Sequence, residues 1–337
     1  MVGLVKVALS DMEESLEVDA PKRRGKLADY LALARLSHST KHVFIVPGFI
    51  LALLLRGPRV ESLLVQIALG LIAAVAIASA NYTINEWLDR EFDKHHPTKA
   101  VRLAVQLDLS GFVVLLAWAV FIAIGELSAL LANDTMFAVA FLFALQGVAY
   151  NVPPLRTKDR AYLDVVSESV NNPLRLMIGW AMVDPTTLPP SSLLLSYWLG
   201  GAFLMGAKRL SEYREIVASH GAELLARYRA SFAGYSETSL HVSCFTYGML
   251  SSFFLAVFLI KYRVEYLLLM PVITALFAYY LALSMRPGSV AQRPENLFRE
   301  PGLVALVVLV VALFVYASFV DVMWIEHLRD QEYIVLP

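Results

Sequence analysis

Nine long apolar stretches divide this chain, and they constrain its fold more than any other feature. An α-helix needs about 20 mostly apolar residues to cross the hydrocarbon core of a bilayer. Hydrophobic residues make up 58% of the 337, above the roughly 45–50% that is usual in soluble domains. We therefore expect an all-α, polytopic membrane protein with nine transmembrane helices. The predicted spans lie near residues 33–56, 61–88, 109–126, 134–151, 162–183, 191–210, 239–260, 264–285 and 302–324.

Lys and Arg are unevenly distributed between the two sides of these predicted spans. The N-terminal segment and the even-numbered connections hold 22 of the 28 Lys and Arg residues, whereas the opposite connections hold five. Cytoplasmic loops of membrane proteins carry the excess of positive charge. We therefore expect a plasma-membrane or inner-membrane protein whose N-terminus faces the cytoplasm and whose C-terminus lies on the other side.

The two ends of the chain differ from the part that forms the spans. Residues 1–26 are polar and contain no apolar core of signal-peptide length before the charges begin, so we expect a polar N-terminal lead. Residues 27–325 form the expected transmembrane domain, and residues 326–337 an extracytoplasmic tail. The single cysteine, Cys244, excludes an internal disulfide and a thiolate metal site. A net charge of -1 gives no indication of nucleic-acid binding.

Four polar residues follow one another at strict four-residue spacing where the second predicted span ends. They are Asn81, Asn85, Asp89 and Asp93. Four residues make slightly more than one helical turn, so the four side chains lie along one helix face. Two carboxylates and two amides on one stripe are costly near lipid. The pattern predicts that this face binds a ligand.

A second polar cluster leads into the fifth predicted span, where Asp164 and Glu168 repeat the four-residue spacing. Oxygen ligands without Cys or an ordered His pair favour Mg²⁺ or Mn²⁺ over zinc. Mg²⁺ commonly completes its coordination shell with substrate phosphates. The acidic pairs therefore predict a site for a departing diphosphate. Nearby cations would balance the negative charge of that diphosphate. The basic residues expected to contribute are Lys41, Lys99, Arg102, Arg156, Lys158, Lys208 and Arg209.

Each feature also has a simpler interpretation. A charge cluster at the end of a membrane helix usually marks a solvated boundary, and Asn81 could hydrogen-bond between helices. A transporter or scaffold could use the same charged end, although the chain shows no matching halves of an inverted repeat. Arg175 is different, because a charge inside a membrane span is costly and usually functional. The simpler interpretations also leave unexplained why two acidic pairs occur on the same side.

These residues resemble the motifs of a known family. Asn85-Glu-x-x-Asp89-x-x-x-Asp93 resembles the first aspartate-rich motif of the UbiA-type intramembrane prenyltransferases, and Asp164-x-x-x-Glu168 resembles the second. The resemblance covers residues 27–325 as the catalytic domain. It implies a bundle of nine transmembrane helices around a central cavity, with Mg²⁺-bound diphosphate at a cytoplasmic cap and a side opening for a polyprenyl chain from membrane lipid.

The resemblance also implies roles for individual residues. The implied catalytic residues are Asp89, Asp93 and Asp164, and the implied metal ligands are Asn85, Asp89, Asp93, Asp164 and Glu168. The implied substrate-binding residues are Asn81, Glu86, Lys41, Lys99, Arg102, Tyr150, Arg156, Lys158, Arg175, Lys208 and Arg209.

Shorter similarities favour one branch of the family. Asp93-KHHPTK resembles the D-R-x-H-P-x-K sequence of the decaprenyl-phosphate phosphoribosyltransferases, which make polyprenyl-phosphoryl-phosphoribose, a cell-wall precursor. Leu174-Arg175 in the fifth span and Ala230-Ser-Phe-x-x-Tyr235-Ser in the loop after the sixth resemble the same branch. The chain departs from the family at Glu86 and Glu168, where most members have Asp, and after Lys99, where the usual R-x-R-P is broken.

Two reactions fit such a site. In the first, a polyprenyl phosphate attacks phosphoribosyl pyrophosphate, and the many basic residues suit two anionic substrates. In the second, a polyprenyl diphosphate donates its prenyl group to an aromatic acceptor such as 4-hydroxybenzoate. The aromatic residues that could stabilise the allylic cation are Tyr82, Trp87, Tyr150 and Trp180. We expect the first reaction, with the second as the alternative.

Overall fold

The computed structural model of the chain describes residues 22–36, 39–96, 99–292, 297, 299–322 and 325, without the side chains of residues 39–41, 226 and 228. Within these ranges the chain is helical and contains no strand, only a single bridge between Arg24 and Asp108. The predicted all-α fold is confirmed. The predictions for residues 1–21 and 326–337 lie outside this part, as does the prediction for the Lys41 side chain.

The first half of the chain forms helices α2 to α10. They are α2 (Leu27–Leu33), η1 (Ser39–Ile45), α3 (Val46–Leu55), α4 (Leu63–Leu88), α5 (Arg90–Asp93), α6 (Leu103–Gln106), α7 (Gly111–Ala132), α8 (Asp134–Asn151), η2 (Thr157–Asp159), α9 (Leu163–Ser169) and α10 (Asn171–Ala181). The second half comprises α11 (Ser191–His220), α12 (Ala222–Tyr228), η3 (Ala230–Gly234), α13 (Glu237–Tyr262), η4 (Val264–Leu269), α14 (Met270–Ser284), η5 (Val290–Gln292) and α15 (Pro301–Phe319).

Five helical segments in the described part are long and apolar enough to cross a membrane. Each of the nine predicted spans contains helical residues. Several of these helices are shorter or more polar than the five that could cross a membrane, so the number of nine spans stays a prediction. The segments that qualify are Leu63–Leu88, Gly111–Ala132, Glu237–Tyr262, Val264–Ser284 and Pro301–Phe319.

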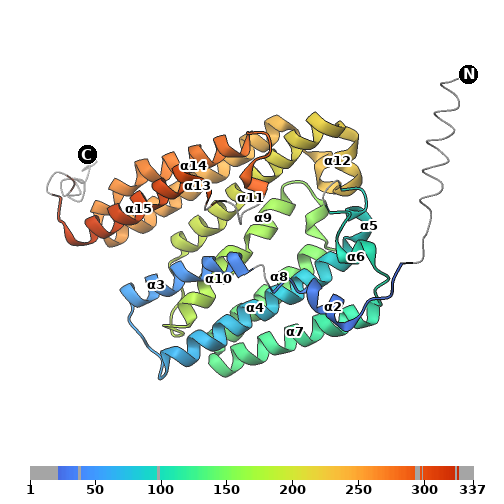
Figure 1. Cartoon of the computed structure of the whole chain (residues 1–337). Helices are drawn as coiled ribbons and strands as arrows, with labels where there is room; N and C mark the ends of the chain where they lie inside the picture. The colour runs from blue at the N-terminus through green and yellow to red at the C-terminus, as the bar shows by residue number, and fades with distance from the viewer. Residues whose placement is uncertain are drawn as a thin grey trace, which may run out of the picture.

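The helices form two groups, which lie above and below each other in Figure 1. Helices α3, α4, α7, α8 and α10 make the lower group and share one apolar core. Helices α11, α13, α14 and α15 make the upper group. The backbones of α3 and α10 approach closely at two glycines: a Cβ on Gly48 would lie 2.0 Å from the Leu176 carbonyl oxygen, and one on Gly179 would lie 2.2 Å from that of Ile45. Small residues allow such close packing of membrane helices.

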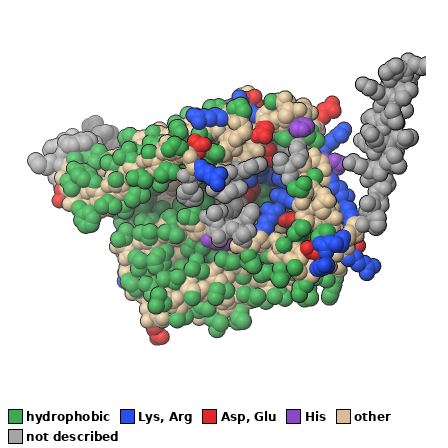
Figure 2. All heavy atoms as spheres, viewed as in Figure 1, with side chains coloured by type: hydrophobic (Ala, Val, Ile, Leu, Met, Phe, Trp, Pro, Cys, Tyr) green, Lys and Arg blue, Asp and Glu red, His purple; other side chains and the backbone are tan. Residues whose placement is uncertain are grey.

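Short helices gather at one end of the bundle. Helices α5, α6 and α12 lie together on the right of Figure 1, where α4 ends and where the connection from α8 to α9 passes. Figure 2 shows apolar side chains over most of the visible flanks, whereas Lys, Arg, Asp and Glu gather toward this end and beside a hollow between the two helix groups. We call this the polar end. Residues that are far apart in the sequence meet there.

Candidate active site

The end of α4 places Asn85 and Asp89 side by side at the polar end. Asn85 Nδ2 donates to Asp89 Oδ2 at 3.1 Å, as expected for residues one turn apart on one helix face. The same nitrogen donates to Asn151 Oδ1, 2.6 Å away at the end of α8. Asn85 therefore orients the Asp89 carboxylate and links α4 to α8.

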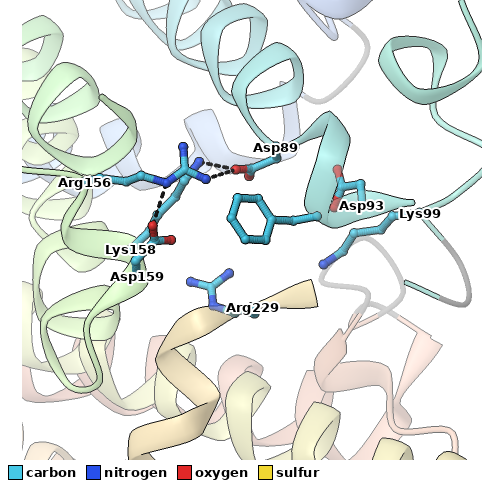
Figure 3. A pocket seen from close by; sticks show the side chains of 8 residues that line it. Asp89, Asp93, Lys99, Arg156, Lys158, Asp159 and Arg229 are labelled. Carbon is cyan, nitrogen blue, oxygen red and sulfur yellow. Dashed lines mark hydrogen bonds and ion pairs between the residues drawn. The ribbon is translucent and has the colours of Figure 1, made fainter. Parts of the chain in front are cut away.

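Two cations from the connection between α8 and α9 hold the other oxygen of Asp89. Arg156 Nη2 lies 2.9 Å and Lys158 Nζ 2.5 Å from Asp89 Oδ1 (Figure 3). Burial alone would raise the pKa of Asp89, but the charges of Lys158 and Arg156 outweigh it and keep that pKa below its usual value. Burial lowers the pKa of Lys158 to about 8, although Asp89 opposes this shift. Asp89 is thus a half-buried carboxylate with its cations already in place.

A pocket opens beside Asp89, and nearly all the side chains that line it are charged. Asp93, on α5, is buried and forms an ion pair with Arg102 at 2.6 Å. The guanidinium of Arg156 lies over the ring of Phe92 at 5.2 Å, so one face of that ring is covered. The lining residues are Asp89, Phe92, Asp93, Lys99, Arg156, Lys158, Asp159 and Arg229 (Figure 3).

Asp164, the first residue of the second motif, is completely buried and fully hydrogen-bonded. Its Oδ2 accepts from Arg209 Nε at 3.1 Å, Arg229 Nη2 at 3.2 Å and Ser231 Oγ at 3.1 Å. Its Oδ1 accepts from the Tyr235 hydroxyl at 2.6 Å. Burial and the Asp164 charge raise the pKa of Tyr235, so its hydroxyl stays protonated and donates. In this structure, the Asp164 carboxylate fixes the α12–η3 segment against α9 and α11.

Glu168, the second residue of that motif, lies one turn further along α9. Its Oε2 accepts from the Tyr150 hydroxyl at 2.8 Å and from Arg209 Nη2 at 3.5 Å. Arg209 also bonds Glu212 at 3.0 Å, so this one guanidinium contacts three carboxylates, those of Asp164, Glu168 and Glu212. The prediction that Asp164 and Glu168 bind metal stays a prediction, because both carboxylates bind protein groups here.

Arg229, which is not among the residues predicted from the sequence, connects the two motifs. Its Nη2 donates to the Tyr150 hydroxyl at 3.1 Å and to Asp164 at 3.2 Å, while the side chain lines the pocket beside Asp89. Burial would lower the pKa of Arg229, but Tyr150, Asp164 and other acidic neighbours keep it well above its usual value. The available signal was its position directly before Ala230-Ser-Phe-x-x-Tyr235, whose Ser231 and Tyr235 also bond Asp164.

A third group of charges joins the loop after α5 to α11. Glu212 lies 3.2 Å from His96 Nε2 and 3.6 Å from Lys99 Nζ. Burial would raise the pKa of Glu212, but Lys99, His96 and Arg209 outweigh it and hold that pKa well below its usual value. Burial also lowers the pKa of both His96 and Lys99. His96 is only 7% exposed although it lies in a loop.

Some predicted site residues lie away from the pocket. Glu86 is buried and accepts a hydrogen bond from Arg35 Nε at 2.8 Å. Consecutive residues of a helix point about 100° apart, so Glu86 does not share the helix face of its neighbour Asn85. Asn81 packs against Gly147 of α8 and donates to the Phe143 carbonyl at 3.3 Å, as a helix-packing amide would. Lys208 is half-buried on α11 outside the pocket lining, and Arg175 is buried on α10.

The pocket provides the kind of ligand that Mg²⁺ prefers. Asp89, Asp93 and Asp159 offer carboxylate oxygens to one space. Among the described residues, no three His, Cys, Asp or Glu side chains converge as a complete metal site. Such a set fits an ion that takes one or two carboxylates and obtains its remaining ligands from substrate phosphates and water.

Comparison with known proteins agrees with this architecture. Residues 45–300 match the UbiA prenyltransferase family. A protoheme IX farnesyltransferase of Bacillus mycoides is 27% identical over 220 residues, which cover 61% of this chain and 69% of that protein. One from Bacillus cereus is 26% identical over 238 residues, covering 65% and 75%. These relatives carry the name of a farnesyltransferase, whereas the sequence motifs predicted the phosphoribosyltransferase branch.

Solved structures share the fold. A UbiA homologue from Archaeoglobus fulgidus, bound to GPP and Mg²⁺, matches with a TM-score of 0.63 and 20% identity, covering 86% of this chain and 99% of that one. A digeranylgeranylglyceryl phosphate synthase matches with a TM-score of 0.59 and 15% identity, covering 87% and 98%. Because the family match extends over most of the chain, this protein is an integral membrane enzyme that belongs to the UbiA prenyltransferase family.

Proposed function

We propose that this enzyme transfers the 5-phosphoribosyl group of phosphoribosyl pyrophosphate to a polyprenyl phosphate and releases pyrophosphate. The observation that carries the proposal is the composition of the pocket. Seven of its eight lining residues are ionisable, and the only aromatic ring, Phe92, has a face covered by Arg156. Such a lining suits a hydrophilic sugar diphosphate better than the reactive end of an apolar prenyl chain.

In the proposed reaction, an oxygen of the lipid phosphate forms a bond to the anomeric carbon of the ribose. The bond between that carbon and the pyrophosphate oxygen breaks, and its electron pair leaves with pyrophosphate. The nucleophile is already an anion, so no base is needed. The site therefore has to position two anions and stabilise the charge that develops on the leaving group.

The residues around the pocket fit these tasks. Lys158, Arg156 and Arg229 approach the pocket from two different segments and would bind the leaving diphosphate through charge-assisted hydrogen bonds. Asp89 and Asp93 would hold Mg²⁺, which neutralises phosphate charge when it is bound. Asn85 and Asn151 keep Asp89 and Lys158 in position. The Lys- and Arg-rich loops around the pocket support a cytoplasmic location for it.

Prenyl transfer from a polyprenyl diphosphate to an aromatic or porphyrin acceptor is the second candidate. The names of the two Bacillus relatives favour it, and so does the GPP bound to the structural homologue. The predicted aromatic cushion for an allylic cation gives it little support. Trp180 bonds Thr187 beyond the other end of α10, and Trp87 lies under Arg90 at 4.7 Å. Tyr150 remains near the motifs, with its hydroxyl bonded to Glu168.

A two-arm transfer assay separates these candidates. Purified protein in nanodiscs with Mg²⁺ receives labelled phosphoribosyl pyrophosphate and a polyprenyl phosphate in one arm. The other arm receives labelled farnesyl diphosphate with 4-hydroxybenzoate or protoheme IX. We expect lipid-extractable label in the first arm only, abolished by EDTA. Product in the second arm alone would overturn the phosphoribosyl proposal and support prenyl transfer, whereas no product in either arm would contradict both.

A further inference from the structure

Arg175 is a buried arginine whose hydrogen bonding is incomplete within the described part of the chain. It lies on α10, within the fifth predicted span, and is 5% exposed. Nη1 donates to the Asn171 carbonyl oxygen at 3.4 Å, and the guanidinium lies over the Phe143 ring at 4.9 Å. In the described part of the chain Nε has no hydrogen-bond partner and no carboxylate forms an ion pair with Arg175. A charge at such a position normally has a partner, so this arrangement indicates a ligand site.

Two further unpartnered polar atoms lie near this guanidinium. The buried Oδ1 atoms of Asn81, on α4, and Asn171, on α10, have no hydrogen-bond partner among the described residues. Asn81 contacts the Phe143 carbonyl, and Arg175 contacts the ring of the same residue. Asn171 precedes Arg175 by one helical turn and therefore lies on the same face. Both oxygens are acceptors, and that of Asn81 packs against Gly147, so the unpartnered donor of this cluster is Arg175 Nε.

The guanidinium lies close below the polar end. Its bond to Asn171 shows that the side chain extends back along α10 toward α9. Asn171 follows Glu168 by three residues, which corresponds to about 4–5 Å along a helix. Glu168 Oε2 bonds Tyr150 and Arg209. A group bound to Arg175 would therefore lie about one helical turn further along the bundle than Glu168 of the second motif.

We propose that the Nε edge of Arg175 binds the anionic head of the acceptor substrate. A guanidinium edge binds a phosphate or a carboxylate through two parallel hydrogen bonds, which a lysine cannot reproduce. The inference rests on the proposed function, in which that anion is the phosphate of a polyprenyl phosphate. A carboxylate-bearing acceptor has the same chemistry, so neutral acceptors are excluded in either case.

Binding and turnover measured on the same variants test this assignment. Arg175→Met removes the charge and the hydrogen bonds, Arg175→Lys keeps the charge without the paired donors, and Arg160→Met removes an exposed arginine from the same end as a matched control. Thermal unfolding in detergent is followed with farnesyl phosphate, with 4-hydroxybenzoate or with neither. Acceptor and donor KM values are measured in the arm of the transfer assay that is active.

We expect one of the two anions to stabilise the wild type and the Arg160→Met variant. Arg175→Met should lose this stabilisation, and its acceptor KM should rise at least tenfold while the KM of the diphosphate donor stays within about threefold. Arg175→Lys should fall between the two. Stabilisation by farnesyl phosphate alone identifies a lipid phosphate, and stabilisation by 4-hydroxybenzoate alone identifies a carboxylate.

Two results would overturn the assignment. One is that neither anion stabilises the wild type, and the other is that Arg175→Met and Arg175→Lys both keep the wild-type response. If Arg175→Met does not fold, unchanged binding by Arg175→Lys is sufficient to reject the paired contact. The proposed function fails separately, through absence of turnover in the phosphoribosyl arm, because the stabilisation by ligand does not depend on turnover.

Discussion

The two ends of the helical bundle hold carboxylates in different ways. Away from the polar end, Asp184 follows α10 and is completely buried. It accepts from the Thr186 backbone at 3.0 Å, the Thr186 and Thr187 hydroxyls at 2.6 and 2.7 Å, and Arg56 Nε at 3.0 Å. At the polar end, Asp89 is surrounded by cations that also line an open pocket.

The partners of the two carboxylates explain this difference. Three of the four bonds to Asp184 come from residues two or three positions further along the chain, and its one cation is Arg56. The pocket at Asp89 brings together four cations, those of Lys99, Arg156, Lys158 and Arg229, against three carboxylates. The first arrangement is closed and needs no ligand. The second exposes four cations to a pocket that a diphosphate can enter, although Lys99 and Arg229 also pair with Glu212 and Asp164.

Replacing the central carboxylate of the polar end should have the largest effect on activity. Asp89→Ala should reduce turnover by about 10²–10³-fold or more, in the range measured when one preorganised transition-state contact is lost, because it removes a proposed metal ligand and the anchor of Arg156 and Lys158. The transfer assay measures the loss, and thermal unfolding in detergent checks that the fold is retained. Wild-type turnover in this variant would show that Asp89, like Asp184, is only structural.

The corresponding change at the other end should affect stability instead. Asp184→Ala leaves the two threonine hydroxyls and Arg56 without their acceptor, and we expect a loss of about 2–3 kcal/mol in the free energy of unfolding. Turnover per folded molecule should stay at the wild-type level. A suitable control is Asp321→Ala, which breaks an exposed ion pair with Arg263 and should leave the unfolding temperature unchanged. A loss of turnover in Asp184→Ala without a loss of stability would contradict the comparison.

Arg229 offers a finer test of the polar end. Arg229→Gln removes the charge that lies between Tyr150, Asp164 and the pocket. One charge-assisted hydrogen bond contributes about 1.5–3 kcal/mol, so turnover should fall roughly tenfold to a hundredfold. Arg227→Gln is the matched control, because Arg227 is exposed and two residues away on α12. Equal effects of the two substitutions would show that general positive charge, and not the placement of Arg229, matters.

The features that could be predicted from the sequence depend on regular local spacing. Helical periodicity places Asn85 and Asp89 on one face, and their side chains bond each other in the structure. The predicted spans follow from the length of apolar runs, and each of them contains helix. The same argument could not show that Glu86 pairs with Arg35, because the partner lies 51 positions earlier in the chain.

The role of the second motif depends on contacts between distant segments. Asp164 and Glu168 have the spacing of a ligand pair, but Arg209, Arg229, Ser231 and Tyr235 come from 45 to 71 positions further along the chain to occupy the Asp164 carboxylate. Spacing within one helix indicates which side chains share a face, and it does not indicate which groups reach that face from elsewhere. For the same reason Arg229 could not be assigned before the fold was known.

The smallest expected effect concerns the response of Asp184 to acid. Burial alone would raise its pKa, but hydrogen bonds from Thr186, Thr187 and Arg56 outweigh burial and hold that pKa below its usual value. A carboxylate whose pKa is lower in the folded state stabilises the fold above its unfolded pKa of about 3.9, and this contribution is lost as the pH falls toward the folded value.

Asp184→Asn removes the ionisation but keeps an acceptor. The difference in unfolding temperature between wild type and this variant should therefore be constant from pH 7 to about 5 and shrink below about pH 4. A difference that does not change with pH would mean that the shape of the side chain at this end, and not its charge, provides the stability.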